Sequence, residues 1–167
     1  AELILIGDGP QKLTLQAMCQ ELDLKSVHWL GQLSMTEVCT HLSVADCLVL
    51  PSRHDGWGAV VSEALMVGTP VICSDSCGAA VVVQASSVGG VFVSGDQNDL
   101  KHLLWRCFEG GKIPLDSRNR IASWASVLGT VCGSEYLVEI LQYSGGLVRP
   151  LPPWCKPSSS QERVGNR

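Results

Sequence analysis

Residues 47–67 read CLVLPSRHDGWGAVVSEALMV. The apolar run at 47–50 predicts a short buried strand, and residues 59–67, which include no glycine or proline, predict a helix. Between the two lies a polar loop that ends in Gly-Trp-Gly. A strand that is apolar at every position needs cover on both faces, so this stretch indicates a parallel sheet between layers of helices.

The same alternation of strand and helix extends to both sides of this stretch. Predicted strands occupy residues 3–6, 27–30, 47–50, 70–73 and 91–93, and predicted helices occupy 11–22, 34–43, 59–67, 79–83 and 96–108, with two further helical patterns in 117–143. Ser34 and Glu37 have the spacing of a capping box at the start of one helix. The pattern predicts an α/β fold: a doubly wound, Rossmann-like parallel sheet of about five or six strands.

Length and composition favour one globular domain. The chain has 167 residues, of which 46% are apolar and 17% are charged, so we expect residues 1–144 to form a single folded unit. Residues 145–167 contain four prolines and a serine run, and we expect a Pro/Ser-rich, disordered tail there. The net charge of −4 and the scattered basic residues argue against nucleic acid or an anionic membrane surface as the main partner.

Cysteine usage and the N-terminal sequence are informative about metal sites and about targeting segments. Most of the eight cysteines lie in apolar runs, which indicates buried reduced thiols, and no CxxC pair or metal-ligand spacing occurs. We therefore expect no metal. The N-terminus lacks the pattern of a signal peptide, and the longest uncharged segment, 76–95, is too polar for a bilayer helix.

The loop at 51–58 is the first place to look for chemistry, because ligands of open parallel sheets bind at the carboxyl ends of the strands. Gly56 and Gly58 open a helix whose first amides are unpaired, which suits a phosphate. Asp55 and Glu63 bracket the loop and could accept hydrogen bonds from ligand hydroxyls. A nucleotide sugar offers both a diphosphate and hydroxyl groups. In the alternative, the glycines only make a turn, Asp55 is a cap and Glu63 lies on a solvated helix face.

A dinucleotide fingerprint is a second alternative for this loop. Gly56 and Gly58 follow a strand, and Asp75 lies 19 residues beyond Gly56, after the next strand. Val61 stands where the fingerprint has Gly or Ala, and five residues separate the strand from Gly56. Both departures argue against nicotinamide chemistry.

The order of several short motifs carries a family resemblance. The motifs are LIGDGP at 5–10, VHWLG at 27–31, AD at 45–46, LVLPS at 48–52, DGWG at 55–58, EA at 63–64, GTPVI at 68–72 and SD at 74–75. From about residue 2 to residue 95 the chain resembles the C-terminal half of GT-B type glycosyltransferases, most closely the retaining family 4 with the glycosyltransferase group 1 domain. The resemblance makes residues 1–144 a nucleotide-sugar-binding domain.

The resemblance also implies residue roles. Glu63 would accept hydrogen bonds from the ribose 2- and 3-hydroxyls, and Asp55, the predicted catalytic residue, would face hydroxyls of the donor sugar. Most members carry Glu at the first position, so the carboxylate of Asp55 sits one methylene further back. The base would lie near Gly31. The backbone amides implied to meet the sugar and the diphosphate are those of Gly56, Trp57, Gly58, Ala59 and Val60.

The implied function is the donor-binding half of a retaining glycosyltransferase in polysaccharide biosynthesis. It would transfer a sugar from a nucleotide-diphosphate sugar to a glycan or lipid-linked acceptor, with no cofactor and no metal. In the family, an Arg and a Lys that neutralise the diphosphate precede the position of Ala1, as does the acceptor-binding domain, so we expect the chain alone to be inactive. The resemblance also implies a cytoplasmic protein, and the full-length enzyme could associate peripherally with the inner face of the membrane.

Alternatives to this function remain at this point. The chain could be a non-catalytic nucleotide-sugar-binding module that needs a separate acceptor domain, or half of a sugar-nucleotide epimerase. Arg53 is the nearest resident cation for a diphosphate. Trp57 either lines the donor pocket or braces the loop, and we expect Arg118 and Arg120 on a solvated face.

Overall fold

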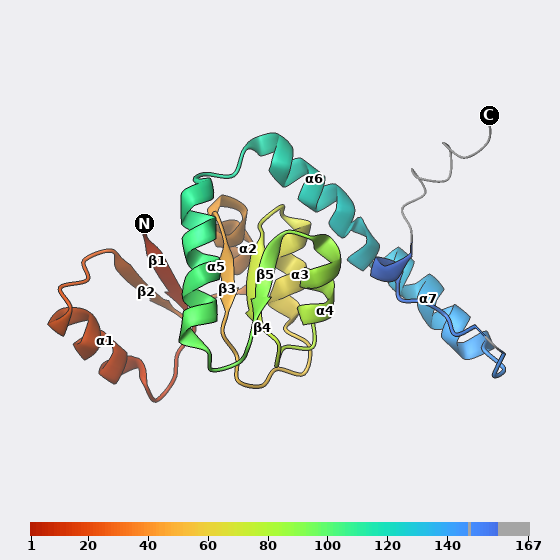
Figure 1. Cartoon of the computed structure of the whole chain (residues 1–167), viewed down its shortest axis with the longest axis horizontal. Helices are drawn as coiled ribbons and strands as arrows, with labels where there is room; N and C mark the ends of the chain where they lie inside the picture. Colours follow the sequence, from red (N-terminus) through yellow and green to blue (C-terminus); the bar gives the residue numbers. More distant parts are fainter. Residues whose placement is uncertain (147, 157–167) are drawn as a thin grey trace.

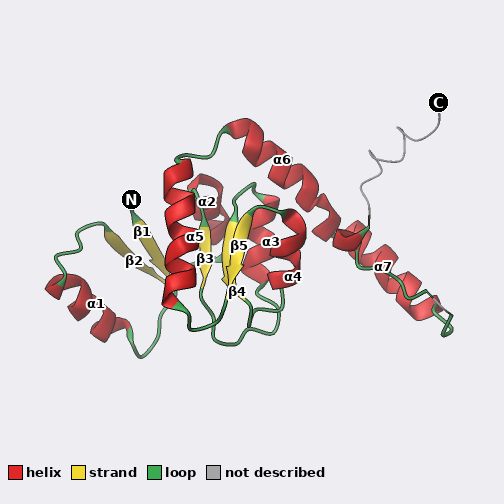
Figure 2. Cartoon of the chain, viewed as in Figure 1, coloured by secondary structure: helices red, strands yellow, loops and turns green. Residues whose placement is uncertain are grey.

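Strands and helices alternate along most of the chain, as the sequence predicts (Figures 1 and 2). The computed structural model describes residues 1–146 and 148–156. The elements in chain order are β1 (Leu3–Ile6), α1 (Lys12–Glu21), β2 (Val27–Gly31), α2 (Met35–Val44), β3 (Leu48–Leu50), α3 (Ala59–Met66), β4 (Val71–Ser74), α4 (Ala80–Ser86), β5 (Gly89–Phe92), α5 (Gln97–Gly110), α6 (Leu115–Ala125), η1 (Ser126–Leu128), α7 (Thr130–Gln142) and η2 (Pro153–Cys155). The α/β fold class is confirmed.

The strands are parallel, but they form two sheets instead of the expected single one. One sheet has the order β1-β2 and the other β3-β4-β5. Leu5 pairs with Trp29 in the first, and Ile72 pairs with Val49 and Gly90 in the second. Among the described residues no strand pairs with the free edges of β1 and β3, so the prediction of one continuous sheet is wrong. Apolar runs identify strands, whereas pairing depends on which edges meet in space.

The hydrophobic core lies around β4. Every residue of β4 is buried, and α3 contributes Val61, Ala64 and Leu65 from its inner face. On the same face of the sheet α4 adds Ala80, Val82 and Val83. The buried Thr69 donates a hydrogen bond from Oγ1 to the carbonyl of Leu42 at 2.6 Å, so the polar group that enters the core is satisfied.

The predicted capping box at the start of α2 is confirmed. The Ser34 amide donates to Oε2 of Glu37 at 2.8 Å, and the Glu37 amide donates to Oγ of Ser34 at 3.4 Å. The Ser34 hydroxyl, which donates to Oε2 of Glu37 at 2.6 Å, and the Ser34 amide hold the pKa of Glu37 below its ordinary value. The local sequence therefore fixes where α2 begins.

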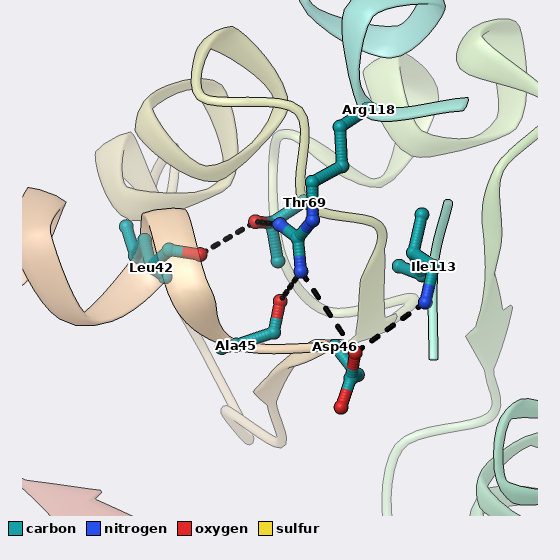
Figure 3. A network of polar contacts seen from close by, with 6 residues as sticks. All are labelled: Leu42, Ala45, Asp46, Thr69, Ile113 and Arg118. Atoms are coloured by element: carbon teal, nitrogen blue, oxygen red, sulfur yellow. Dashed lines mark hydrogen bonds and ion pairs between the residues drawn. The ribbon is translucent and has the colours of Figure 1, made fainter. Parts of the chain in front are cut away.

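Arg118 of α6 does not lie on the solvated face that the sequence suggested. Its guanidinium donates to Oγ1 of Thr69 at 3.0 Å and to the carbonyl of Ala45 at 2.6 Å, and it lies 3.8 Å from Oδ1 of Asp46 (Figure 3). The amide of Ile113 donates to the same Asp46 oxygen at 3.4 Å. The network joins α6 to the segments that enter β3 and β4, at the opposite ends of these strands from the Gly-Trp-Gly loop.

The C-terminal segment is partly ordered against the core. Residues 148–156 run back along α7, and η2 lies within this segment (Figure 1). In η2, Pro153 is buried and Trp154 packs against the core cluster. This packing differs from the tail expected over 145–167, because the apolar surface of Pro153 and Trp154 outweighs the high proline content of the segment. The rest of that expectation, residues 147 and 157–167, lies outside the described residues.

Candidate functional site

The loop after β3 is fixed to the loop after β4 by backbone hydrogen bonds. The amide of Asp55 donates to the carbonyl of Ser76 at 3.1 Å, and the amide of Gly78 donates to the carbonyl of Asp55 at 3.1 Å. The amide of Ala79 donates to the carbonyl of Trp57 at 2.7 Å. The two loops therefore form one structure at the carboxyl ends of neighbouring strands, where α/β sheets bind ligands.

Two glycines make this close approach possible. A Cβ on Gly78 would lie 2.2 Å from the carbonyl oxygen of Gly56. Gly58 has φ +81°, and a Cβ there would lie 2.5 Å from Sγ of Cys77. A larger residue at either position would separate the loops or distort the entry into α3.

The N-terminus of α3 presents amides that donate no hydrogen bond within the described part of the chain. Gly58 is the N-cap of this eight-residue helix and brings no side-chain cap. Within residues 1–146 and 148–156, no acceptor is hydrogen-bonded to the amides of Gly56, Gly58, Ala59 or Val60, whereas the Val61 amide donates to the carbonyl of Gly58. Unpaired amides at the positive end of a helix dipole suit an anion.

The two predicted acidic residues have different surroundings. Asp55 is half-buried, and its Oδ1 accepts the Trp57 amide at 3.1 Å, so this side chain also shapes the loop. Glu63, one turn into α3, is half-buried too, and its carboxylate has no hydrogen bond or ion pair to any described residue. A half-buried carboxylate without an internal partner is open to ligand hydroxyls.

Trp57 lies in the middle of the loop and is 41% exposed. Its carbonyl accepts the Ala79 amide and also the thiol of Cys77 at 3.2 Å. Its ring packs against the ring of Trp154. Trp57 therefore braces the loop, and its exposed surface is available beside the free amides.

Gly31 belongs to the other sheet. It ends β2 with φ +69°, and its carbonyl accepts the amide of Gly7 at 2.7 Å. No hydrogen bond within the described part of the chain links Gly31 to the loop at 51–58. The strands of both sheets run in the same general direction in Figure 1, so both segments follow carboxyl ends at the same side of the molecule.

The alternative chemistries find little support in the geometry. Oδ1 of Asp75 accepts the Ser94 amide at 2.9 Å, which ties this carboxylate to the loop after β5. Burial raises the pKa of Cys73 to about 12, and burial together with the neighbouring Cys107 thiol raises the pKa of Cys47 to about 12. Such thiols stay protonated at neutral pH and make poor nucleophiles.

A search for metal sites and membrane spans covers the same described residues. Their His, Cys, Asp and Glu side chains do not gather in groups of three or more that could hold a metal ion. None of their helices combines the length and the apolarity that crossing a bilayer demands.

Sequence reasoning missed two parts of the site. The segment Ser76 to Ala79 anchors the loop, and a signal for it exists, because it follows a predicted strand and includes a glycine. Trp154 contacts the loop from 97 residues further along the chain, and no local pattern indicates that contact.

Comparison with known proteins points to one family. Residues 1–124 match the family model described as Glycosyl transferases group 1. The chain is 31% identical over 112 residues to the GDP-mannose-dependent monoacylated alpha-(1-6)-phosphatidylinositol monomannoside mannosyltransferase of Corynebacterium glutamicum, a match that covers 62% of this chain and 29% of that protein. It is 31% identical over 97 residues to the N-acetyl-alpha-D-glucosaminyl L-malate synthase of Bacillus anthracis, covering 58% of this chain and 25% of that protein.

Solved structures share the fold. WaaG, a glycosyltransferase involved in lipopolysaccharide biosynthesis, superimposes with a TM-score of 0.68 at 21% identity, over 87% of this chain and 38% of WaaG. Anabaena HepE, solved in complex with UDP, gives a TM-score of 0.70 at 21% identity, over 84% of this chain and 40% of HepE. The chain spans less than a third of the two curated relatives named above.

Proposed function

The chain belongs to the group 1 glycosyl transferases, and from this membership we propose that residues 55–63 bind the nucleoside diphosphate of a nucleotide sugar. The observation that supports the proposal most strongly is the start of α3. The amides of Gly58, Ala59 and Val60, about one helical turn from the carboxylate of Glu63, have no partner among residues 1–146 and 148–156, and neither has that carboxylate. An anion and a pair of hydroxyls, at about one turn of separation, are what a nucleoside diphosphate offers.

Each group has a role in this proposal. The amides of Gly56, Gly58, Ala59 and Val60 receive the diphosphate and the sugar, because they donate to no acceptor among the described residues. The Trp57 amide, which the resemblance also implied, donates to Oδ1 of Asp55 instead. Glu63 accepts hydrogen bonds from the ribose hydroxyls. Asp55 contacts the donor sugar with Oδ2, since its Oδ1 is occupied by the Trp57 amide. The base lies towards Gly31.

The proposed reaction is sugar transfer with retention to a glycan or lipid-linked acceptor, without a cofactor or a metal. The bond between the anomeric carbon and the diphosphate oxygen breaks, and its electron pair leaves with the diphosphate. The acceptor oxygen then bonds to the same face of the anomeric carbon and loses its proton to the leaving group. Stabilising the negative charge that develops on the diphosphate is a major part of such catalysis.

Charge limits what this segment does by itself. In the loop at 51–58 the permanent cation is Arg53, an exposed residue. Backbone amides can hold the diphosphate, but one exposed cation stabilises its departure weakly. We therefore expect the 167-residue chain to bind a donor nucleotide and to transfer sugar slowly or not at all, which is also the behaviour of a non-catalytic binding module.

Isothermal titration with UDP and GDP tests the proposal, because HepE was solved with UDP and the Corynebacterium relative is named for GDP-mannose. The tighter ligand is then compared with its 2′,3′-dideoxy analogue. Glu63→Ala should weaken binding of the ribonucleotide by about 10- to 100-fold, the value of hydrogen bonds to a charged group, and should leave the affinity for the dideoxy analogue unchanged.

The matched control is Glu135→Ala, which removes an exposed carboxylate from α7 and should alter neither affinity. Equal affinity of the parent chain and Glu63→Ala for the ribonucleotide would show that the ribose assignment is wrong. Absence of binding for both nucleotides would overturn the proposal for the whole loop. Analysis of products from a nucleotide sugar distinguishes transfer from epimerisation.

A further inference from the structure

Two tryptophans far apart in sequence meet beside the candidate binding loop. The ring centroids of Trp57 and Trp154 are 5.7 Å apart, and the ring planes are inclined by 48°. This distance and tilt fall within the range of favourable aromatic pairs. The pair connects η2, near the C-terminal end of the described chain, to the Gly-Trp-Gly loop.

Trp154 is held by its own surroundings. It is half-buried and packs against the hydrophobic core cluster, and the adjacent Pro153 is buried. Two residues later, Nζ of Lys156 lies 2.7 Å and 3.0 Å from the two carboxylate oxygens of Glu139 in α7. The ring of Trp154 is therefore a fixed surface.

Trp57 is 41% exposed, and its backbone is hydrogen-bonded within the loop. Its amide donates to Oδ1 of Asp55, and its carbonyl accepts the amide of Ala79 and the thiol of Cys77. It stands directly between Gly56 and Gly58, neither of which has a side chain that could restrict the loop. A shift of the Trp57 backbone therefore moves the amides on both sides.

We propose that Trp154 is a positioning residue, which fixes Trp57 and thereby keeps the free amides at the start of α3 directed at the ligand. The C-terminal segment 148–156 thus belongs to the donor site, although it is distant in sequence. The effect on ligand affinity rests on the proposed function, whereas the effect on loop order does not. The two glycines make the loop adaptable, and the aromatic contact removes that freedom.

The test compares Trp154→Ala and Trp154→Phe with the parent chain. The control is Trp105→Ala, which disrupts another tilted aromatic pair, Trp105 with Phe108 on α5, at a centroid distance of 5.9 Å. Three signals are measured: the far-ultraviolet exciton couplet of paired tryptophans, hydrogen exchange of the Gly78 and Ala79 amides, and the dissociation constants of UDP and GDP.

Trp154→Ala should abolish the exciton couplet, speed exchange of both amides by about 3- to 10-fold, and weaken nucleotide binding by a similar factor. Trp154→Phe loses the couplet but retains an aromatic face, so it should keep the exchange rates and the affinity of the parent chain. Trp105→Ala should change neither exchange at these two amides nor affinity.

A double-mutant cycle separates positioning from general destabilisation. In a Trp57→Ala background, Trp154→Ala should produce no further change in exchange at Gly78 and Ala79. If Trp154→Ala speeds exchange in the Trp57→Ala background as much as it does in the parent chain, the proposal is overturned. Unchanged exchange in the single variant Trp154→Ala would also overturn it. If Trp154→Ala does not fold, the same cycle is run with Trp154→Leu. If exchange responds but neither nucleotide binds the parent chain, the proposed function fails and the positioning role of Trp154 stands.

Discussion

Two segments of this chain have the same local design and different burial. The N-terminal unit, β1-α1-β2 at residues 3–31, and the central unit, β3-α3-β4 at residues 48–74, both consist of parallel strands joined by a helix. No residue from 1 to 41 is buried, whereas β4 is buried along its whole length. A strand-helix-strand pattern therefore specifies the elements but does not specify a core.

The difference follows from what covers each sheet. β4 has a strand on both sides and takes cover from α3 and α4. β1 has one neighbouring strand, and α1 buries none of its residues. In the usual doubly wound order 3-2-1-4-5-6, β1 and β2 correspond to strands 2 and 3, and β3, β4 and β5 correspond to strands 4, 5 and 6. The described residues include no strand at the place of strand 1.

The largest expected contrast comes from matched leucines on the two helices. Leu65 of α3 is 0% exposed, so Leu65→Ala should lower the free energy of unfolding by about 2–5 kcal/mol through lost burial and a cavity. Leu15 of α1 is 41% exposed, and Leu15→Ala should cost less than about 1 kcal/mol. Urea denaturation measures both. Equal losses would mean that the N-terminal unit is as well packed in solution as the central unit.

A smaller contrast comes from two basic residues. Arg118→Met removes both donors that satisfy Thr69 and the carbonyl of Ala45, and should cost about 1–3 kcal/mol in the same experiment. Lys12→Met removes an exposed pair with Asp8 in the N-terminal unit, at 3.2 Å, and should produce no measurable change. A neutral Arg118→Met would show that the network of Figure 3 adds nothing to stability.

The smallest contrast is a dependence on alkaline pH. Burial raises the pKa of Cys73 in the central unit to about 12, above the value of about 8.5 expected in the unfolded chain. Since the unfolded state loses this proton first, stability is complete below about pH 8.5 and falls as the pH rises towards 12, by about 1 kcal/mol at pH 9.5.

Chemical denaturation at pH 7.5 and 9.5 measures this loss. Cys73→Ala should lose less stability than the parent chain between these two pH values. Cys19→Ala, a change in the less buried α1, should lose as much stability as the parent chain. An undiminished loss in Cys73→Ala would assign the alkaline sensitivity to other groups.

The sequence anticipated most of the fold for local reasons. Apolar runs identified all five strands, and the capping box placed the start of α2. The roles of Asp55 and Glu63 stay predictions, but the structure places both beside the start of α3, and Glu63 has no partner among the residues that the structure describes. Arg118 was misjudged because its partners, Ala45 and Thr69, are distant in sequence.

The sequence by itself determined the order of elements, the glycine loop and the acidic residues around it, because periodicity and turn chemistry act over a few neighbouring residues. The tertiary structure alone decided that the strands divide into two sheets, that Arg118 holds three segments together, and that Trp154 meets Trp57. These outcomes depend on which strand edges and helix faces meet in the folded chain. A local sequence pattern does not identify a partner that is distant in sequence.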